Sequence, residues 1–183
     1  SNVASMAAAL VMATSLGGIY SKNVVMVFAY AAIGLLASII GVATARIDEN
    51  GNPGKALNSS TYVTTITYAL LTALSTWLFN FEWRIWGATA VGLLVGTIIG
   101  ITTDYFTNDT KPPVQAVATA SKSGPAFTII SGFSYGLLST LPALIGIAIT
   151  ALISYNLCAP LGEGYGMFGI SMSALGMLSI VGM

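Results

Sequence analysis

The chain has 183 residues, of which 55% are hydrophobic and only 7% are charged, whereas about a quarter of the residues of a soluble protein carry charge. This composition leaves too little polar surface for a soluble fold and predicts an integral membrane protein. Six Lys and Arg balance six Asp and Glu, and there is no His. A basic nucleic-acid-binding face and a His-based metal site or pH switch are therefore excluded.

Six apolar runs of roughly the length of a membrane span predict an all-α, polytopic transmembrane helix bundle. The predicted spans cover residues 3–19, 24–45, 59–80, 85–104, 126–157 and 165–183. Four of them look complete, and the first and last look truncated. We therefore expect residues 1–183 to form a single membrane-domain fragment of a larger protein.

No charged side chain lies in the interior of these runs. Ion pathways, proton relays and hydrolytic sites within a bilayer normally need ionisable groups at membrane depth. The sequence therefore predicts no catalytic, cofactor-binding or metal-binding residue inside the spans. Cys158 has no second Cys as a disulfide partner, and we interpret it as a small apolar side chain at a helix end rather than as a reactive thiol.

The connectors carry turn and capping residues. Residues 16–23 separate the first two spans, residues 48–54 separate the second from the third, and residues 58–60 supply N-cap candidates for the third helix. The longest connector, about 104–124, contains two Pro and four charged residues. Three tryptophans cluster around the 80–82 turn, as in an aromatic belt at one membrane interface: Trp77, Trp83 and Trp86.

The positively charged residues predict the orientation in the membrane. Counted on alternate connectors, one side of the membrane carries Arg46, Lys55, Lys111 and Lys122, and the other carries Lys22 and Arg84. Because cytoplasmic loops carry the excess of Lys and Arg, we expect the second-to-third and fourth-to-fifth connectors to face the cytoplasm.

Glycines at intervals of four residues mark helix faces suited to close packing. Gly92, Gly96 and Gly100 form such a stripe on the fourth span, and Gly132 and Gly136 repeat the spacing on the fifth. Residues four apart share one face of a helix, where missing side chains let another backbone approach. We favour tight helix packing over a role in substrate passage.

The third span is rich in hydroxyl groups, and two interpretations remain open. These groups can bond to their own helix or to a neighbouring helix, or they can line a polar pore, which we consider the less favoured alternative. The residues are Thr61, Thr64, Thr65, Thr67, Thr72, Ser75 and Thr76.

Several motifs resemble those of the membrane-integral, ion-pumping pyrophosphatases. Residues 103–107 (TDYFT) are similar to that family's Thr-Glu-Tyr-Tyr-Thr run, and the step at 112–118 is similar to one that leads into a short cytoplasmic helix. Residues 123–128 resemble a Thr-Gly-x-Ala-Thr turn that opens a long span. Tyr165-Gly166 followed by residues 174–179 (ALGMLS) is similar to the start of an inner helix.

The chain departs from the family pattern at three positions: Asp104 stands for Glu, Phe106 stands for Tyr, and Pro125 lies inside the Gly-x-Ala turn. At the other end, residues 1–5 look like the continuation of the family's inner helix just after a membrane-embedded Glu, with Asn2 where Tyr is usual.

The resemblance implies a parent protein of about sixteen helices that works as a homodimer, hydrolyses inorganic pyrophosphate at the cytoplasmic face and pumps H⁺ or Na⁺ outward. It implies Mg²⁺ bound by residues outside this stretch, and it leaves open whether K⁺ is a second cofactor. The second to fifth spans would be mostly outer-ring scaffold helices, and the membrane would be a bacterial plasma membrane. Asp104 and Asp109 are then solvated loop charges, and Lys111 and Lys122 are membrane anchors rather than phosphate ligands.

Two other classes of protein remain open from the residues alone. A secondary transporter or channel subunit would use a span broken at Pro125 or Pro142 as a binding site, although no internal repeat is visible. A structural membrane subunit without hydrolase activity would have much the same composition as this chain.

Overall fold

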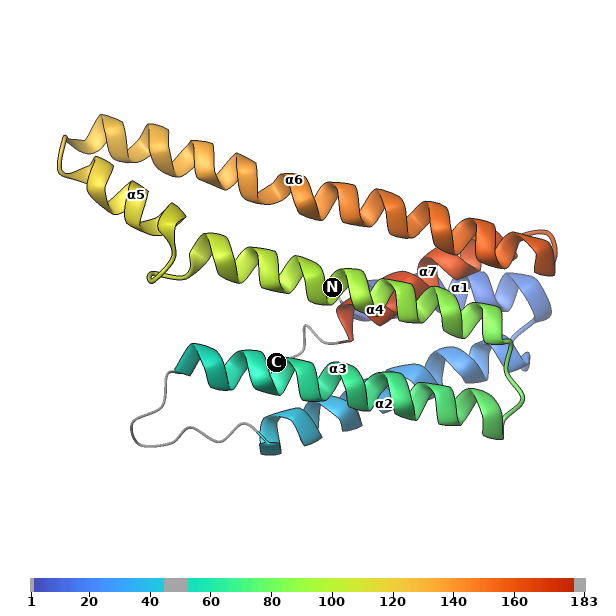
Figure 1. Cartoon of the computed structure of the whole chain (residues 1–183). Coiled ribbons are helices and arrows are strands. Elements are labelled where there is room, and N and C mark those ends of the chain that lie inside the picture. Colours follow the sequence, from blue (N-terminus) through green and yellow to red (C-terminus); the bar gives the residue numbers. More distant parts are fainter. Residues whose placement is uncertain (1, 45–52, 180–183) are drawn as a thin grey trace. The chain divides into compact units, whose positions relative to one another are not determined.

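The computed structural model describes residues 2–44 and 53–179, and all the elements in these ranges are helices (Figure 1). In chain order they are α1 (Asn2–Gly17), α2 (Lys22–Thr44), α3 (Pro53–Leu78), α4 (Trp83–Thr107), α5 (Pro112–Ser121), α6 (Pro125–Cys158), the 3₁₀ turn η1 (Ala159–Leu161) and α7 (Tyr165–Leu178). The all-α class predicted from the sequence is confirmed.

Each predicted span corresponds to one long helix or to an apolar shorter one. Within the described residues, three helical stretches are long and apolar enough to cross a membrane: Lys22–Thr44, Trp83–Ser121 and Pro125–Leu161. The α1 and α7 helices are apolar but contain only 16 and 14 residues. The α3 helix has 26 residues, and its many hydroxyl groups make it less apolar than the three long stretches.

Two details of the connectors differ from the sequence-based expectation. The proposed N-caps at residues 58–60 are wrong, because α3 already begins at Pro53, at a first helical position that favours proline. The long connector is also not irregular throughout, since it contains α5. This short helix starts at Pro112, where the resemblance placed one. The rest of the second-to-third connector, residues 45–52, lies outside the described residues.

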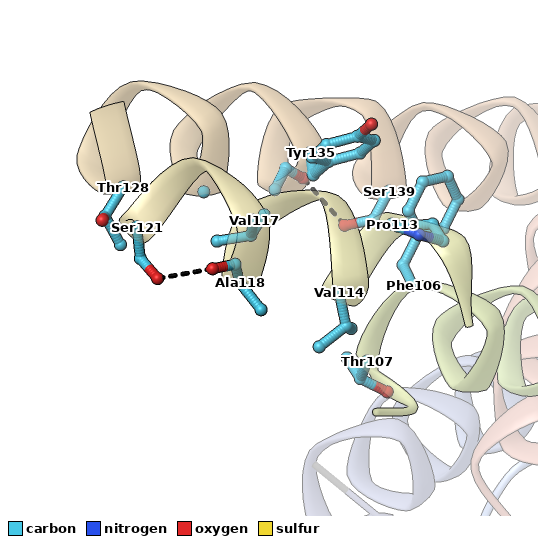
Figure 2. A pocket seen from close by; sticks show the side chains of 12 residues that line it. Phe106, Thr107, Pro113, Val114, Val117, Ala118, Ser121, Thr128, Tyr135 and Ser139 are labelled. Atoms are coloured by element: carbon cyan, nitrogen blue, oxygen red, sulfur yellow. Dashed lines mark hydrogen bonds between the residues drawn. The ribbon is translucent and has the colours of Figure 1, made fainter. Parts of the chain in front are cut away.

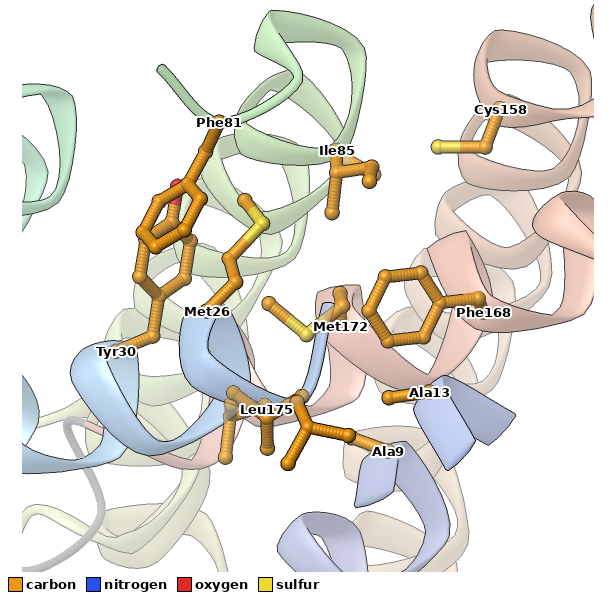
Figure 3. Close-up of a cluster of buried hydrophobic side chains, with 13 residues drawn as sticks. Ala9, Ala13, Met26, Tyr30, Phe81, Ile85, Cys158, Phe168, Met172 and Leu175 are labelled. Carbon is orange, nitrogen blue, oxygen red and sulfur yellow. The ribbon is translucent and has the colours of Figure 1, made fainter. Parts of the chain in front are cut away.

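The described chain divides into two compact units, and α4 and α6 each contribute to both. The first unit comprises residues 1–97 and 150–183. In it α1 packs against α2 and α7, and α2 packs against α3. Its main core joins side chains from five helices and the α3–α4 turn (Figure 3). The largest buried members are Met26, Tyr30, Ile85, Phe168 and Met172.

The second unit comprises residues 98–149 and contains the end of α4, α5 and the first part of α6. The chain reverses between α5 and α6 at Ser123-Gly124, where Gly124 has φ of +123°, a conformation that favours glycine. Pro125 is the first residue of α6, and the helix continues through Pro142 to Cys158. Neither proline therefore interrupts the helix, contrary to the broken-span alternative.

Candidate functional site

The best-packed element of the first unit is α7. It begins after Gly164, whose φ of +85° lies in the left-handed region, and half of its 14 residues are buried. Several of the buried residues are small: Gly166, Gly169, Ser173 and Gly176. Small side chains on a membrane helix let neighbouring backbones come close, so other helices can pack tightly against α7.

The predicted glycine stripe of α4 packs against α7 at its first two positions. A Cβ atom added to Gly92 would overlap the backbone carbonyl of Ser173, and one added to Gly96 would lie 3.0 Å from the carbonyl oxygen of Met177. From the other side, a Cβ atom on Gly176 would overlap the carbonyl oxygen of Thr89. Glycines on both helices thus set the distance between α4 and α7.

The end of α6 approaches α7 through two more glycines. A Cβ atom on Gly166 would lie 2.6 Å from the ring of Tyr155, and one on Gly169 would lie 2.6 Å from the sulfur of Cys158. Cys158 is buried, as its interpretation as a small apolar residue requires. This packing face is not among the sequence-based predictions, although the Gly169-x-x-x-Ser173 spacing on α7 repeats the spacing of the glycine stripe on α4.

The remaining predicted glycines do not pack in this way. Within the second unit, a Cβ atom on Gly100, Gly132 or Gly136 would meet no atom within 4 Å. Gly132 and Gly136 instead line an apolar groove of about 420 Å³ between α5 and α6 (Figure 2). Four hydroxyl groups on its wall donate to backbone carbonyls three or four residues earlier in the chain: those of Thr107, Ser121, Thr128 and Ser139.

The hydroxyl groups of α3 form a buried row at intervals of four residues. Ser60, Thr64, Tyr68, Thr72 and Thr76 are all buried. The hydroxyls of Thr64, Thr72 and Thr76 each donate to the carbonyl oxygen four residues earlier, over 2.7–2.9 Å. This back-bonding satisfies their protons within the helix, so these three offer acceptor lone pairs but no free donors.

Three bonds connect this row to the helices beside it. The Ser60 hydroxyl donates to the carbonyl of Gly41 on α2 over 2.7 Å. The Tyr30 hydroxyl lies 2.5 Å from the Thr76 hydroxyl, which already donates within α3, so Tyr30 is the donor. The indole Nε1–H of Trp86 donates to the Thr72 hydroxyl over 3.3 Å. The contacts favour bonding between helices over the pore-lining alternative.

Asp104 lies in the last turn of α4 and is therefore not the loop charge that was expected, whereas Asp109 lies in the connector between α4 and α5. Asp104 accepts a hydrogen bond of 3.4 Å from the side chain of Asn108, and Lys111 and Lys122 flank α5. The described residues contain no group of three or more Asp, Glu, His or Cys side chains that could hold a metal ion. Arg46, on the predicted cytoplasmic side, lies outside the described residues.

A family model for inorganic H⁺ pyrophosphatase matches residues 1–183. The chain belongs to this family. It is 38% identical, over 95% of its length, to a protein of Clostridium tetani named as a K(+)-stimulated pyrophosphate-energized sodium pump. It is 37% identical, over 88% of its length, to a protein of the same name from Bacteroides thetaiotaomicron. A K(+)-insensitive pyrophosphate-energized proton pump of Moorella thermoacetica is 34% identical over 86% of the chain.

The chain spans about a quarter of the length of these relatives, covering 26%, 23% and 24% of them. Membership of this membrane-protein family agrees with the three long apolar helical stretches. The glycine contacts and the hydroxyl hydrogen bonds described above pack these helices together, beside the apolar core.

Proposed function

We propose that the protein carrying this stretch hydrolyses inorganic pyrophosphate and uses the free energy released to move H⁺ or Na⁺ out of the cytoplasm. The observation that carries the proposal is the family match over residues 1–183. The names of the relatives support it, since both sodium pumps and proton pumps are among them. Either cation therefore remains a candidate cargo.

Within this protein, we propose that the stretch supplies scaffold and packing rather than chemistry. The α4–α7 contact is built on glycines, and the α2–α3–α4 contacts use hydroxyl and indole hydrogen bonds. The described residues offer no cluster of ligands for Mg²⁺. The residues that bind Mg²⁺ and pyrophosphate would then lie in other parts of the protein.

We further propose that the protein works as a homodimer in a bacterial plasma membrane. The most apolar part of the α6 stretch is only 6% buried within this chain. Apolar side chains exposed over this length must be covered by lipid or by protein. K⁺ dependence is left to experiment, because the relatives include both K⁺-stimulated and K⁺-insensitive pumps.

The test is made on the full-length protein in inside-out membrane vesicles. We expect pyrophosphate, in the presence of Mg²⁺, to cause phosphate release together with uptake of H⁺ or Na⁺, followed with a pH-sensitive and a Na⁺-sensitive dye. Ionophores that collapse the gradient should abolish uptake but leave phosphate release. Vesicles that release no phosphate from pyrophosphate would contradict the proposal, and release without uptake of either cation would contradict its transport half.

A further inference from the structure

The groove between α5 and α6 lies wholly within the second unit (Figure 2). Its volume is about 420 Å³ and its lining is mostly apolar. Val114 and Val117 of α5 lie on one wall, and Gly132 and Gly136 of α6 lie on the other. A Cβ atom on either glycine would meet no atom of this unit within 4 Å. No part of the second unit therefore packs over these glycines.

The polar groups of the lining do not suit a polar ligand. Apart from Tyr135, every hydroxyl-bearing side chain of the lining already donates to a backbone carbonyl three or four residues earlier: Thr107, Ser121, Thr128 and Ser139. No charged side chain lines the groove. A charged or strongly polar molecule would lose its hydration here without enough compensating bonds. The groove therefore fits an apolar occupant.

The lengths of α4 and α6 place the groove outside the lipid hydrocarbon. The sulfur of Cys158 contacts the start of α4, where the aromatic belt is predicted. Along α6, Gly132 lies about 39 Å of helix away from Cys158, and along α4, Phe106 lies about 34 Å away from Trp83. The hydrocarbon core is about 30 Å thick. Acyl chains therefore end before the groove, although apolar side chains such as Phe133 are still 68% exposed there.

The glycines of the groove repeat a spacing that receives a helix elsewhere in the chain. Gly92 and Gly96 are four residues apart on α4, and the backbone of α7 lies against both. Gly132 and Gly136 have the same spacing on α6. The chain spans about a quarter of the length of its relatives, so a protein of their length has many further helices that can supply the covering surface.

We propose that an apolar helix of the same polypeptide, from outside residues 1–183, packs into the groove between α5 and α6. Its backbone lies against Gly132 and Gly136, and its side chains contact Val114 and Val117. The inference rests on the scaffold role proposed above for this stretch. It does not depend on pyrophosphate hydrolysis or ion transport, because helix packing is measured separately from both.

The direct test is photo-crosslinking of the full-length protein in membrane vesicles, with a photoreactive amino acid in place of Val117. We expect light to link it to a peptide from outside residues 1–183, in a product that migrates as one subunit. The control carries the same amino acid in place of Gln115, which lies on α5 but does not line the groove, and it should not form this link. A link to a second copy, to lipid or to another part of residues 1–183 would overturn the proposal, as would the absence of any link to protein.

A second test compares Gly136→Leu with Gly100→Leu. Gly100 also meets no atom within 4 Å in its unit but does not line the groove. If a helix covers the groove, Leu at position 136 has no room, and the apparent Tm falls below that of Gly100→Leu. If the groove faces water, both variants gain the better helix former, and a Tm of Gly136→Leu equal to or above that of Gly100→Leu would overturn the proposal. Loss of folded protein in Gly136→Leu alone would have the same meaning as the lower Tm.

Discussion

At Gly92 the absence of a side chain sets the distance between α4 and α7. The neighbour that a Cβ atom would overlap is the backbone of Ser173, which cannot turn away as the end of a flexible side chain can. Gly100 lies two helical turns further along the same helix and, within its own unit, has no atom within 4 Å of the position a Cβ atom would take. The two glycines thus share a sequence pattern and differ in environment.

Gly92→Ala should therefore destabilise the full-length protein, whereas Gly100→Ala should not. Forcing a methyl group into a packed interface costs about 1–3 kcal/mol, while Ala is intrinsically the better helix former. The measurement is the apparent Tm of the purified protein in detergent, together with the fraction that elutes as a single species. Equal Tm values for the two variants would show that the α4–α7 contact does not depend on Gly92.

The sequence predicts the long apolar helices, but it does not predict where some of these helices begin or which helix faces are in contact. The start of α3 was misjudged because residues 58–60 are good N-caps, but Pro53 allows the helix to begin earlier. The glycine spacing predicted close packing at Gly92 and Gly96 but also at Gly132. A spacing shows which residues share a face, and only the tertiary structure shows whether another helix covers that face.

The α6 helix is longer than a membrane span. Its 34 residues correspond to about 51 Å of helix, against a hydrocarbon core of about 30 Å. The sulfur of Cys158, the last residue of α6, lies 3.7 Å from the carbonyl oxygen of Arg84. Arg84 follows Trp83, so this end of α6 lies at the level of the predicted aromatic belt. The excess length therefore belongs to the first part of α6, which adjoins α5.

This geometry predicts that Ile129 lies outside the hydrocarbon core and Leu144 inside it, although the two side chains are 70% and 66% exposed in the described chain. In a Cys158→Ala background, Ile129→Cys should react with a charged thiol reagent in permeabilised cells, and Leu144→Cys should not. A charged reagent reacts only where water reaches. Reaction of Leu144→Cys, or protection of Ile129→Cys, would show that α6 crosses the membrane at a different depth.

For the whole molecule, the orientation rests on the distribution of positive charge. Lys111 and Lys122 flank α5. At the opposite ends of the spans, Lys22 is the first residue of α2 and Arg84 is the second residue of α4. If successive spans cross the membrane in opposite directions, the α5–α6 turn lies on the side that carries more Lys and Arg. That side is the cytoplasm. The turn between α6 and α7 then faces outward, and both turns carry an exposed side chain suited to labelling: Ser123 and Glu163.

The orientation predicts opposite labelling at these two turns. In the Cys158→Ala background, an impermeant thiol reagent applied to intact cells should label Glu163→Cys and leave Ser123→Cys unlabelled until the membrane is permeabilised. Cys158→Ala alone should show no labelling and serves as the blank. The reverse pattern would invert the assignment and place α5 outside the cell, away from the cytoplasmic pyrophosphate on which the proposed pump depends. Labelling of both sites in intact cells would mean that α6 does not cross the membrane.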